Sequence, residues 1–287
     1  MVGLQETGKT TFLAALWQVV TSNEVPGALR LVKLDSDSEY VDGVHQDWLQ
    51  SRPVERTPMG NYQFVSMKLG TVDNSHLAEV IVPDLSGELF SEQWQVRKWT
   101  ASHDRLLREA SGLLLFVHPR QISRFEMITS DTGELVSLIA DGTEETTEEE
   151  ELLEFDILKV PTPVQLVDLL QFIAGKHYLN HLNRVAVIVS AWDLIRTEEI
   201  APQAWLNREA PLLAQYLRAN EIRFQHRVYG ISAQGADLAV EGAAAALELN
   251  LITKASERII VRECGLAEHH DITAPLKWLM DAERNRP

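Results

Sequence analysis

Two residues into the chain stands Gly3-Leu4-Gln5-Glu6-Thr7-Gly8-Lys9-Thr10, and the apolar stretch Thr11–Trp17 follows it directly. The first eight residues have the pattern G-x-x-x-x-G-K-[ST], in which glycines allow successive backbone N–H groups to turn toward one anion. The apolar stretch is expected to form a helix whose positive N-terminal dipole faces the same anion. The segment therefore predicts a nucleotide phosphate site, with candidate contacts at Gly3, Gln5, Glu6, Thr7, Gly8, Lys9, Thr10 and Thr11.

This phosphate loop is the Walker A motif of P-loop NTPases. Lys9 would place a positive charge on the β and γ phosphates, and we predict a catalytic role for it because it neutralises charge that develops during phosphoryl transfer. The Thr10 hydroxyl is a candidate ligand for Mg²⁺. The alternative is a glycine turn before an ordinary helix, and the immediate start of the required helix argues against it.

The residues ahead of the loop are too few for the usual architecture. A buried strand normally runs into the first glycine, and here only Met1 and Val2 precede it. A truncated central strand would leave buried backbone groups on its neighbours unpaired, at a cost of roughly 1–3 kcal/mol for each group. We therefore expect the true start to lie upstream of Met1, with about five more apolar residues completing the strand.

Composition limits the classes of protein to consider. The 287 residues are 45% hydrophobic, and their formal net charge of −16 argues against binding to nucleic acid or to anionic membranes. The single cysteine, Cys264, rules out an intrachain disulfide framework, and no apolar run reaches the length of a membrane span. His269-His270-Asp271 carries metal-ligand residue types, but a surface loop is the simpler interpretation because adjacent histidines seldom share one metal. We expect a cytoplasmic protein with no membrane and no direct nucleic-acid partner.

Strands alternate with helices along most of the chain, which predicts a three-layer α/β fold with a mostly parallel sheet and insertions. The runs Tyr62–Leu69 and Leu77–Val82 predict an antiparallel hairpin that adds one antiparallel strand at the edge of the sheet. We expect a single domain over residues 1–287. Within it, residues 119–160 form an acidic insertion, interpreted as solvated chain and not as a metal site. Residues 236–287 are expected to form a helical extension packed on the domain.

A second candidate segment, Asp84-Leu85-Ser86-Gly87, follows the apolar strand that ends at Val82. A carboxylate at that place can hold Mg²⁺ directly or through water, so Asp84 is a candidate metal ligand. Gly87 has no side chain to block the approach of a γ phosphate to its N–H group. An ordinary turn at the end of a strand is the alternative, because Asp, Ser and Gly all favour turns.

A third segment is the polar, proline-broken loop that contains Arg56 and Thr57. Thr57 could close over Mg²⁺ when a γ phosphate is present and be released after hydrolysis. Arg56 could stabilise transition-state charge as an arginine finger supplied by the same chain. A plain polar loop is the alternative for both residues.

Two further segments follow predicted buried strands. Asp193 ends Ser190-Ala191-Trp192-Asp193 and could accept hydrogen bonds from the N1–H and the amino group of guanine, which adenine cannot offer together. A helix N-cap is the alternative role for this aspartate. Ser232-Ala233-Gln234 follows the last strand, and its backbone N–H groups could reach the guanine carbonyl; a plain turn is the alternative.

Taken together, the segments resemble the Ras-like GTPases of the translation-factor-related (TRAFAC) class of P-loop proteins. In that class the phosphate loop, a switch threonine, D-x-x-G, N/T-K-x-D and S-A-K occur in this order. The chain is similar in particular to bacterial GTPase domains of the double-GTPase type from predicted conflict systems. This similarity rests on three sequence segments, Gly3–Trp17, Thr162-Pro163 and Thr273–Leu279. The resemblance implies GTP and GDP as ligands, Mg²⁺ as cofactor, and a protein partner that senses the switch loops.

Three departures from that pattern matter. Ser190 and Ala191 stand where the family has Asn and Lys, so the lysine stem that packs over the base is missing. Either base affinity is weaker, or Trp192 takes the place of the lysine. Glu88 stands where Ras proteins have a water-orienting glutamine, and a carboxylate beside a γ phosphate is repulsive unless it is protonated or screened.

These observations predict a GTP-binding switch that hydrolyses GTP slowly, with Lys9, Arg56 and Glu88 as candidate catalytic residues. Nucleotide contacts are expected from the phosphate loop and from Gly87, Ser190, Trp192, Asp193, Ser232 and Ala233, with Thr10, Thr57 and Asp84 at the metal. The alternative is a scaffold that holds nucleotide without turning it over. An ATPase of another P-loop class is a third possibility, which the order of the hairpin and motifs argues against.

Overall fold

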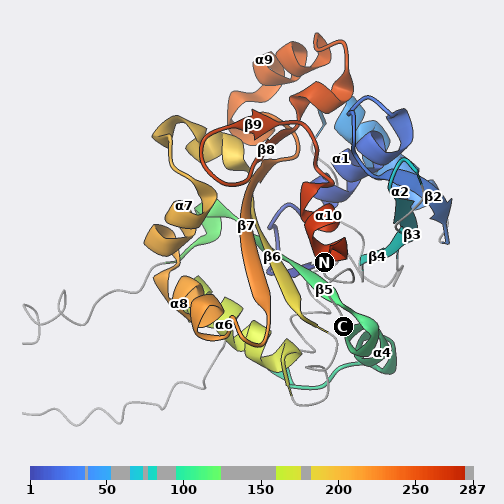
Figure 1. The fold of residues 1–287 in the computed structure, drawn as a ribbon. Coiled ribbons are helices and arrows are strands. Elements are labelled where there is room, and N and C mark those ends of the chain that lie inside the picture. Colours follow the sequence, from blue (N-terminus) through green and yellow to red (C-terminus); the bar gives the residue numbers. More distant parts are fainter. Residues whose placement is uncertain are drawn as a thin grey trace, which may run out of the picture.

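A computed structural model of the chain is shown in Figure 1. It describes residues 1–35, 38–52, 65–73, 77–82, 95–123, 160–175 and 182–281.

In this described part, six strands form the main sheet, in the order β1-β5-β6-β7-β8-β9. The strands are β1 (Val2–Gly3), β5 (Gly112–Val117), β6 (Arg184–Ser190), β7 (Gln225–Ser232), β8 (Ile260–Arg262) and β9 (Glu268–His269). The first four are parallel, whereas β8 and β9 run antiparallel to their neighbours. β5 and β6 are almost wholly buried, as expected for central strands covered on both faces. The predicted mostly parallel α/β sheet is confirmed.

A second sheet of three antiparallel strands is formed by described residues in the order β2-β3-β4. It contains β2 (Arg30–Leu34), β3 (Val65–Gly70) and β4 (Leu77–Val82). The β3–β4 hairpin was predicted, but its placement as one edge strand of the main sheet was wrong, because β2 pairs with it in a sheet of its own. The Met1 nitrogen donates to the Ile81 carbonyl oxygen across 3.3 Å and joins the two sheets beside the two-residue strand β1.

Helices cover both faces of the main sheet (Figure 1). One core cluster contains residues of α1 (Lys9–Ser22), α2 (Ser38–Leu49) and α10 (Ala274–Met280), together with the second sheet. The other cluster lies on the opposite face, with α6 (Thr162–Ile173), α7 (Pro202–Glu209) and α8 (Pro211–Ala219). The alternation of apolar side chains along the strands therefore divides the core into two layers of helices around one sheet.

Helix boundaries differ from expectation where proline or a capping residue intervenes. The apolar pattern of residues 204–217 would suit one continuous helix, but Pro211 lacks an N–H group to continue it, so the segment is split into α7 and α8. The helix α4 (Ala101–Glu109) begins after Thr100, whose side chain accepts a hydrogen bond from the His103 backbone N–H.

The segment after residue 236 was expected to be helical, and this is only partly correct. It contains α9 (Leu238–Asn250), the 3₁₀ helix η4 (Ala255–Arg258) and α10, but β8 and β9 between them extend the main sheet.

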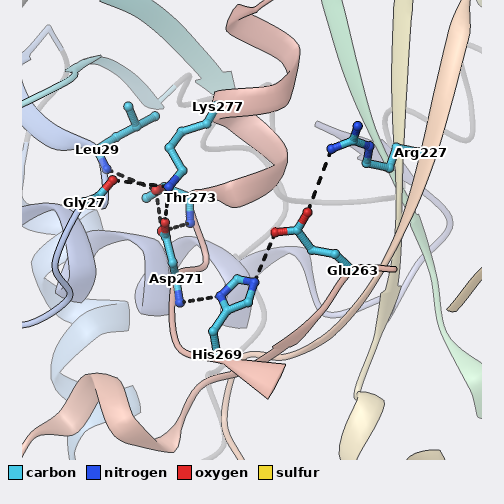
Figure 2. Close-up of polar contacts among 8 residues, drawn as sticks. All are labelled: Gly27, Leu29, Arg227, Glu263, His269, Asp271, Thr273 and Lys277. Atoms are coloured by element: carbon cyan, nitrogen blue, oxygen red, sulfur yellow. Dashed lines mark hydrogen bonds and ion pairs between the residues drawn. The ribbon is translucent and has the colours of Figure 1, made fainter. Parts of the chain in front are cut away.

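Polar contacts fix α10 against the loop after α1 (Figure 2). Asp271 accepts a hydrogen bond from the Thr273 N–H at 2.9 Å and forms an ion pair with Lys277, whose ammonium also donates to the Gly27 carbonyl at 3.2 Å. His269 Nδ1 accepts from the Asp271 N–H, and its Nε2 lies 3.1 Å from Glu263. The contacts of His269 and Asp271 are thus structural. No group of three or more His, Cys, Asp or Glu side chains in the described ranges is placed to hold a metal.

Candidate functional site

The carboxyl ends of the parallel strands bring four loops to one edge of the main sheet. In open α/β sheets this edge is the usual place for ligands. A cavity of about 260 Å³ lies there. It is lined by Gly8 and Thr11 from the phosphate loop side, by Asp193 after β6, and by Ser232 and Ala233 at the end of β7. Segments that are more than 200 residues apart in the sequence, from Gly8 to Ala233, therefore border a single cavity.

Two glycines give the phosphate loop its course. Gly8 has φ = 80° and immediately precedes α1, a left-handed conformation that residues with a Cβ rarely adopt. Gly3 lies so close to β5 that a Cβ would come within 2.9 Å of the Phe116 Cβ. Both positions explain why the pattern requires glycine, and α1 starts with the Phe12 N–H to Gly8 carbonyl bond of 2.9 Å.

Lys9 lies inside the phosphate loop. Its ammonium donates to the carbonyl oxygens of Gly3 at 3.0 Å and Leu4 at 2.6 Å, and it lies 3.2 Å from the Thr7 hydroxyl. Burial lowers the pKa of Lys9 to about 8, since the charged form is partly removed from water. A cation that is poorly solvated and held by neutral carbonyls is predisposed to bind an anion.

The other predicted contacts of the loop fall into two groups. Thr10 and Thr11 lie in the first turn of α1, half-buried. Gln5 and Glu6 are exposed, and the Glu6 carbonyl accepts a hydrogen bond from the Gln121 side chain at 3.3 Å. The Thr10 hydroxyl is a hard oxygen donor, and Mg²⁺ is normally held by one or two protein oxygens together with phosphates and water. The Thr10 hydroxyl, in the first turn of α1, is therefore an oxygen ligand of the kind that Mg²⁺ prefers.

The loops after β6 and β7 also line the cavity. Ser190 is buried and its hydroxyl donates to the Val117 carbonyl at 3.2 Å, which ties β6 to β5. Ala191 has φ = 45°, and Asp193 follows in the first turn of the 3₁₀ helix η3 (Trp192–Glu198). The Ser232 hydroxyl accepts from the Gly235 N–H at 2.9 Å and so closes the turn after β7.

The expectation that Trp192 packs over a base is not supported by its position. Its side chain is fully buried, and the ring lies directly on Gly230, where an added Cβ would come within 2.2 Å of it. It also packs edge-on against Trp205 at a centroid distance of 6.5 Å. The Trp192 ring belongs to the core cluster that contains α6, α7 and α8, where its large apolar area is removed from water. It does not line the cavity.

Sequence reasoning missed several residues of the cavity wall. Arg52 follows α2 and lines the cavity, as do Arg120 and Asp237, which form an ion pair with Nη1 and Oδ2 2.5 Å apart. His118, at the end of β5, also lines it, and burial together with the Arg120 charge lowers the pKa of His118. The place of His118 at a strand end was a usable signal, whereas nothing in the sequence near Arg52 connects it with the site.

Five of the predicted site residues lie outside the described residues: Arg56, Thr57, Asp84, Gly87 and Glu88. Their roles stay predictions. The sequence places Asp84 two residues after the buried Val82 at the end of β4, and Arg56 and Thr57 a few residues after Arg52.

Comparison with known proteins supplies an independent assignment. The model of one protein family, Double-GTPase 1, matches residues 1–279. Searches of curated proteins and of solved structures give no significant match. The match extends over almost the whole chain, including the phosphate loop, the strand-end loops that form the cavity wall and α10. The chain therefore belongs to the Double-GTPase 1 family, a family of GTPases.

Proposed function

We propose that the protein binds GTP with Mg²⁺, hydrolyses it slowly to GDP and acts as a nucleotide-dependent switch. The observation that supports this most strongly is the shared cavity, which is lined by Gly8 and Thr11 of the phosphate loop side and by Asp193, Ser232 and Ala233 of the strand-end loops. We assign a polyphosphate to the first set of residues, called the phosphate end, and a guanine base to the second, called the base end, as parts of one molecule.

The phosphate end would stabilise the charge that develops on the transferred phosphoryl group. Backbone N–H groups of the loop and the helix dipole of α1 would bind the phosphate oxygens, and the Lys9 ammonium would neutralise them. Bound Mg²⁺ would supply further charge neutralisation between the β and γ phosphates. Thr10, Thr57 and Asp84 are the residues we assign to holding it, and Gly87 would offer its N–H group to the γ phosphate.

Hydrolysis also requires a positioned water and a counter-charge. We assign these roles to Glu88 and Arg56, respectively. The unfavourable interaction of the Glu88 carboxylate with a γ phosphate is the reason for expecting a low intrinsic rate. Thr57 and Gly87 would order their loops around GTP and release them after hydrolysis, and a protein partner would read that change.

The base end would select guanine. The Asp193 carboxylate has two oxygens that can accept from the N1–H and amino groups of guanine. Backbone N–H groups near Ala233 would donate to the guanine carbonyl. The family resemblance supports a bacterial cytoplasmic protein of a conflict system. Within the described ranges, every helix is too short or too polar to pass through a lipid bilayer.

A nucleotide-binding scaffold without turnover is the second candidate, because Glu88 stands where Ras proteins have a water-orienting glutamine and Ser190-Ala191 alter the base motif. Single-turnover hydrolysis by the wild type and by Lys9→Ala separates the two. A GTPase loses both affinity and cleavage in the variant, whereas a scaffold binds Mg²⁺ and GTP without measurable cleavage in the wild type. Parallel titrations with GTP and ATP test the base, and a preference for ATP would contradict the guanine assignment.

A further inference from the structure

The proposed base site lacks a long side chain at the position where the family has its lysine. Ala191 provides only a methyl group where a long side chain is expected, and Trp192 next to it is buried in the core. A base that leaves water gains free energy from an apolar or cationic side chain lying on its ring. Another element that lines the cavity can therefore take over the role of the lysine stem.

The end of α2 is fixed at the base end of the cavity. The indole Nε1 of Trp48, a fully buried residue, donates to the Ala233 carbonyl at 2.9 Å. Ala233 itself lines the cavity. The last turn of α2 is therefore held against the loop that we assign to base recognition.

A buried arginine secures the same turn from the other side. Arg258 of η4 donates to the carbonyl of Leu49 at 3.0 Å and to the Ser51 hydroxyl at 3.3 Å. Its guanidinium also lies 5.5 Å from the centre of the Trp48 ring. The positive charge complements the negative end of the α2 dipole, so the backbone up to Ser51 is well anchored.

Arg52 comes directly after this anchor. Its backbone N–H donates to the Asp47 carbonyl at 2.9 Å, and its side chain is exposed at the wall of the cavity. Arg120, also at the wall, has its charge neutralised by Asp237. Within the described ranges, the Arg52 guanidinium forms no hydrogen bond or ion pair. Arg52 therefore combines an anchored backbone with a guanidinium that has no partner among the described residues.

We propose that Arg52 lays its guanidinium over the face of the nucleotide base and takes the place of the missing lysine stem. The inference rests on the proposed function, since it requires a guanine nucleotide in the cavity. A planar guanidinium is weakly hydrated and stacks on aromatic rings, which suits it to this role better than a point charge. Its anchor, Trp48, contacts Ala233, which we assign to the base end.

The test measures affinities of GMP, GDP and GTP, with Mg²⁺, for the wild type, Arg52→Ala and Arg52→Lys. A base contact is common to the three nucleotides, so R52A is expected to weaken all three by the same factor, about 3- to 30-fold. R52K is expected to recover only part of the loss. Arg30→Ala, which removes an exposed cation on β2, serves as the control and should match the wild type.

Several outcomes overturn the inference. A loss that grows with the number of phosphates would make Arg52 a phosphate ligand, and full recovery in R52K would exclude a role for the planar group. Unchanged affinities in a folded R52A protein would show that Arg52 does not touch the nucleotide. If the wild type binds none of the three nucleotides, the proposed function fails instead. Melting temperatures of all variants confirm that they are folded.

Discussion

The indole Nε1 of Trp48 donates a hydrogen bond to the Ala233 carbonyl oxygen, 2.9 Å away, and joins the end of α2 to the loop after β7. The two residues are 185 positions apart, and both belong to segments at the nucleotide cavity. Arg52 follows Trp48 by four residues, so this contact helps to hold Arg52 at the cavity wall.

Replacing Trp48 by Phe keeps most of the buried ring but removes the donor. The Ala233 carbonyl would be left without this partner, and we expect a loss of roughly 1–3 kcal/mol in the free energy of unfolding. Because the base loop is then less restrained, affinity for GDP should fall as well. Chemical denaturation and GDP titration measure the two effects.

The control is Trp17→Phe, which truncates an indole of the same core on α1 and should lower stability without changing GDP affinity. Unchanged GDP affinity in Trp48→Phe would show that the contact is only structural.

The packing of Trp192 on Gly230 gives a second prediction. In Gly230→Ala the new Cβ would meet the Trp192 ring at 2.2 Å, so the ring or β7 has to move, at a cost of about 1–3 kcal/mol or more. Since Asp193 follows Trp192 directly, GDP affinity should fall with stability. Gly43→Ala is the matched control, because its Cβ would point into open space on α2 and Ala is the better helix former. Thermal unfolding should show the first variant destabilised and the second slightly stabilised. Equal melting temperatures would contradict the argument.

The parts of the fold that sequence predicted are those with local signals. The phosphate loop is recognisable because its glycines have to adopt unusual conformations within eight residues. β5 and β6 are continuous apolar runs, since helices cover them on both faces. β8 and β9 escaped notice because strands of three and two residues are too short for a periodic pattern. They are defined by tertiary pairing, β8 with β7 and β9 with β8.

The site was predictable to the extent that strand order brings loops together. Asp193 and Ser232 were found because parallel strands end at one edge of the sheet. The orientation of Trp192 could not be read from the sequence, since a residue after a strand can turn to either face. Arg52 was missed for a different reason: only tertiary packing of α2 on α1 and against Ala233 brings it to the cavity.

The depressed pKa of Lys9 predicts a pH dependence of nucleotide binding. Polyphosphate favours the charged ammonium, so binding raises the Lys9 pKa from its value of about 8 in the free protein. In the free protein the Lys9 amine is mostly charged at pH 7 and mostly neutral at pH 9. Above about pH 8, nucleotide binding therefore requires Lys9 to take up a proton. GDP affinity should therefore fall as pH rises, by about tenfold between pH 7 and pH 9.

Calorimetry at pH 8.5 in buffers with different ionisation enthalpies measures the proton uptake that accompanies GDP binding. Lys9→Ala should show weaker binding without this pH dependence. A wild-type affinity that is constant across the range would contradict the prediction.

Asp193→Asn tests how the base is recognised. An aspartate offers only acceptors, which match the two donors of guanine, whereas an asparagine amide offers one acceptor and one donor. Xanthine keeps the N1–H donor but has a carbonyl in place of the amino group. The variant should therefore bind GDP about 5- to 150-fold more weakly than the wild type and bind xanthosine diphosphate more tightly, since a mismatched buried hydrogen bond costs about 1–3 kcal/mol. Competition titrations with both nucleotides measure the change in preference. The N-cap of η3 is Ala191, so the capping role considered for Asp193 does not apply. If Asp193 only stabilises the first turn of η3 by its charge, the variant keeps the wild-type preference and shows at most a small change in melting temperature.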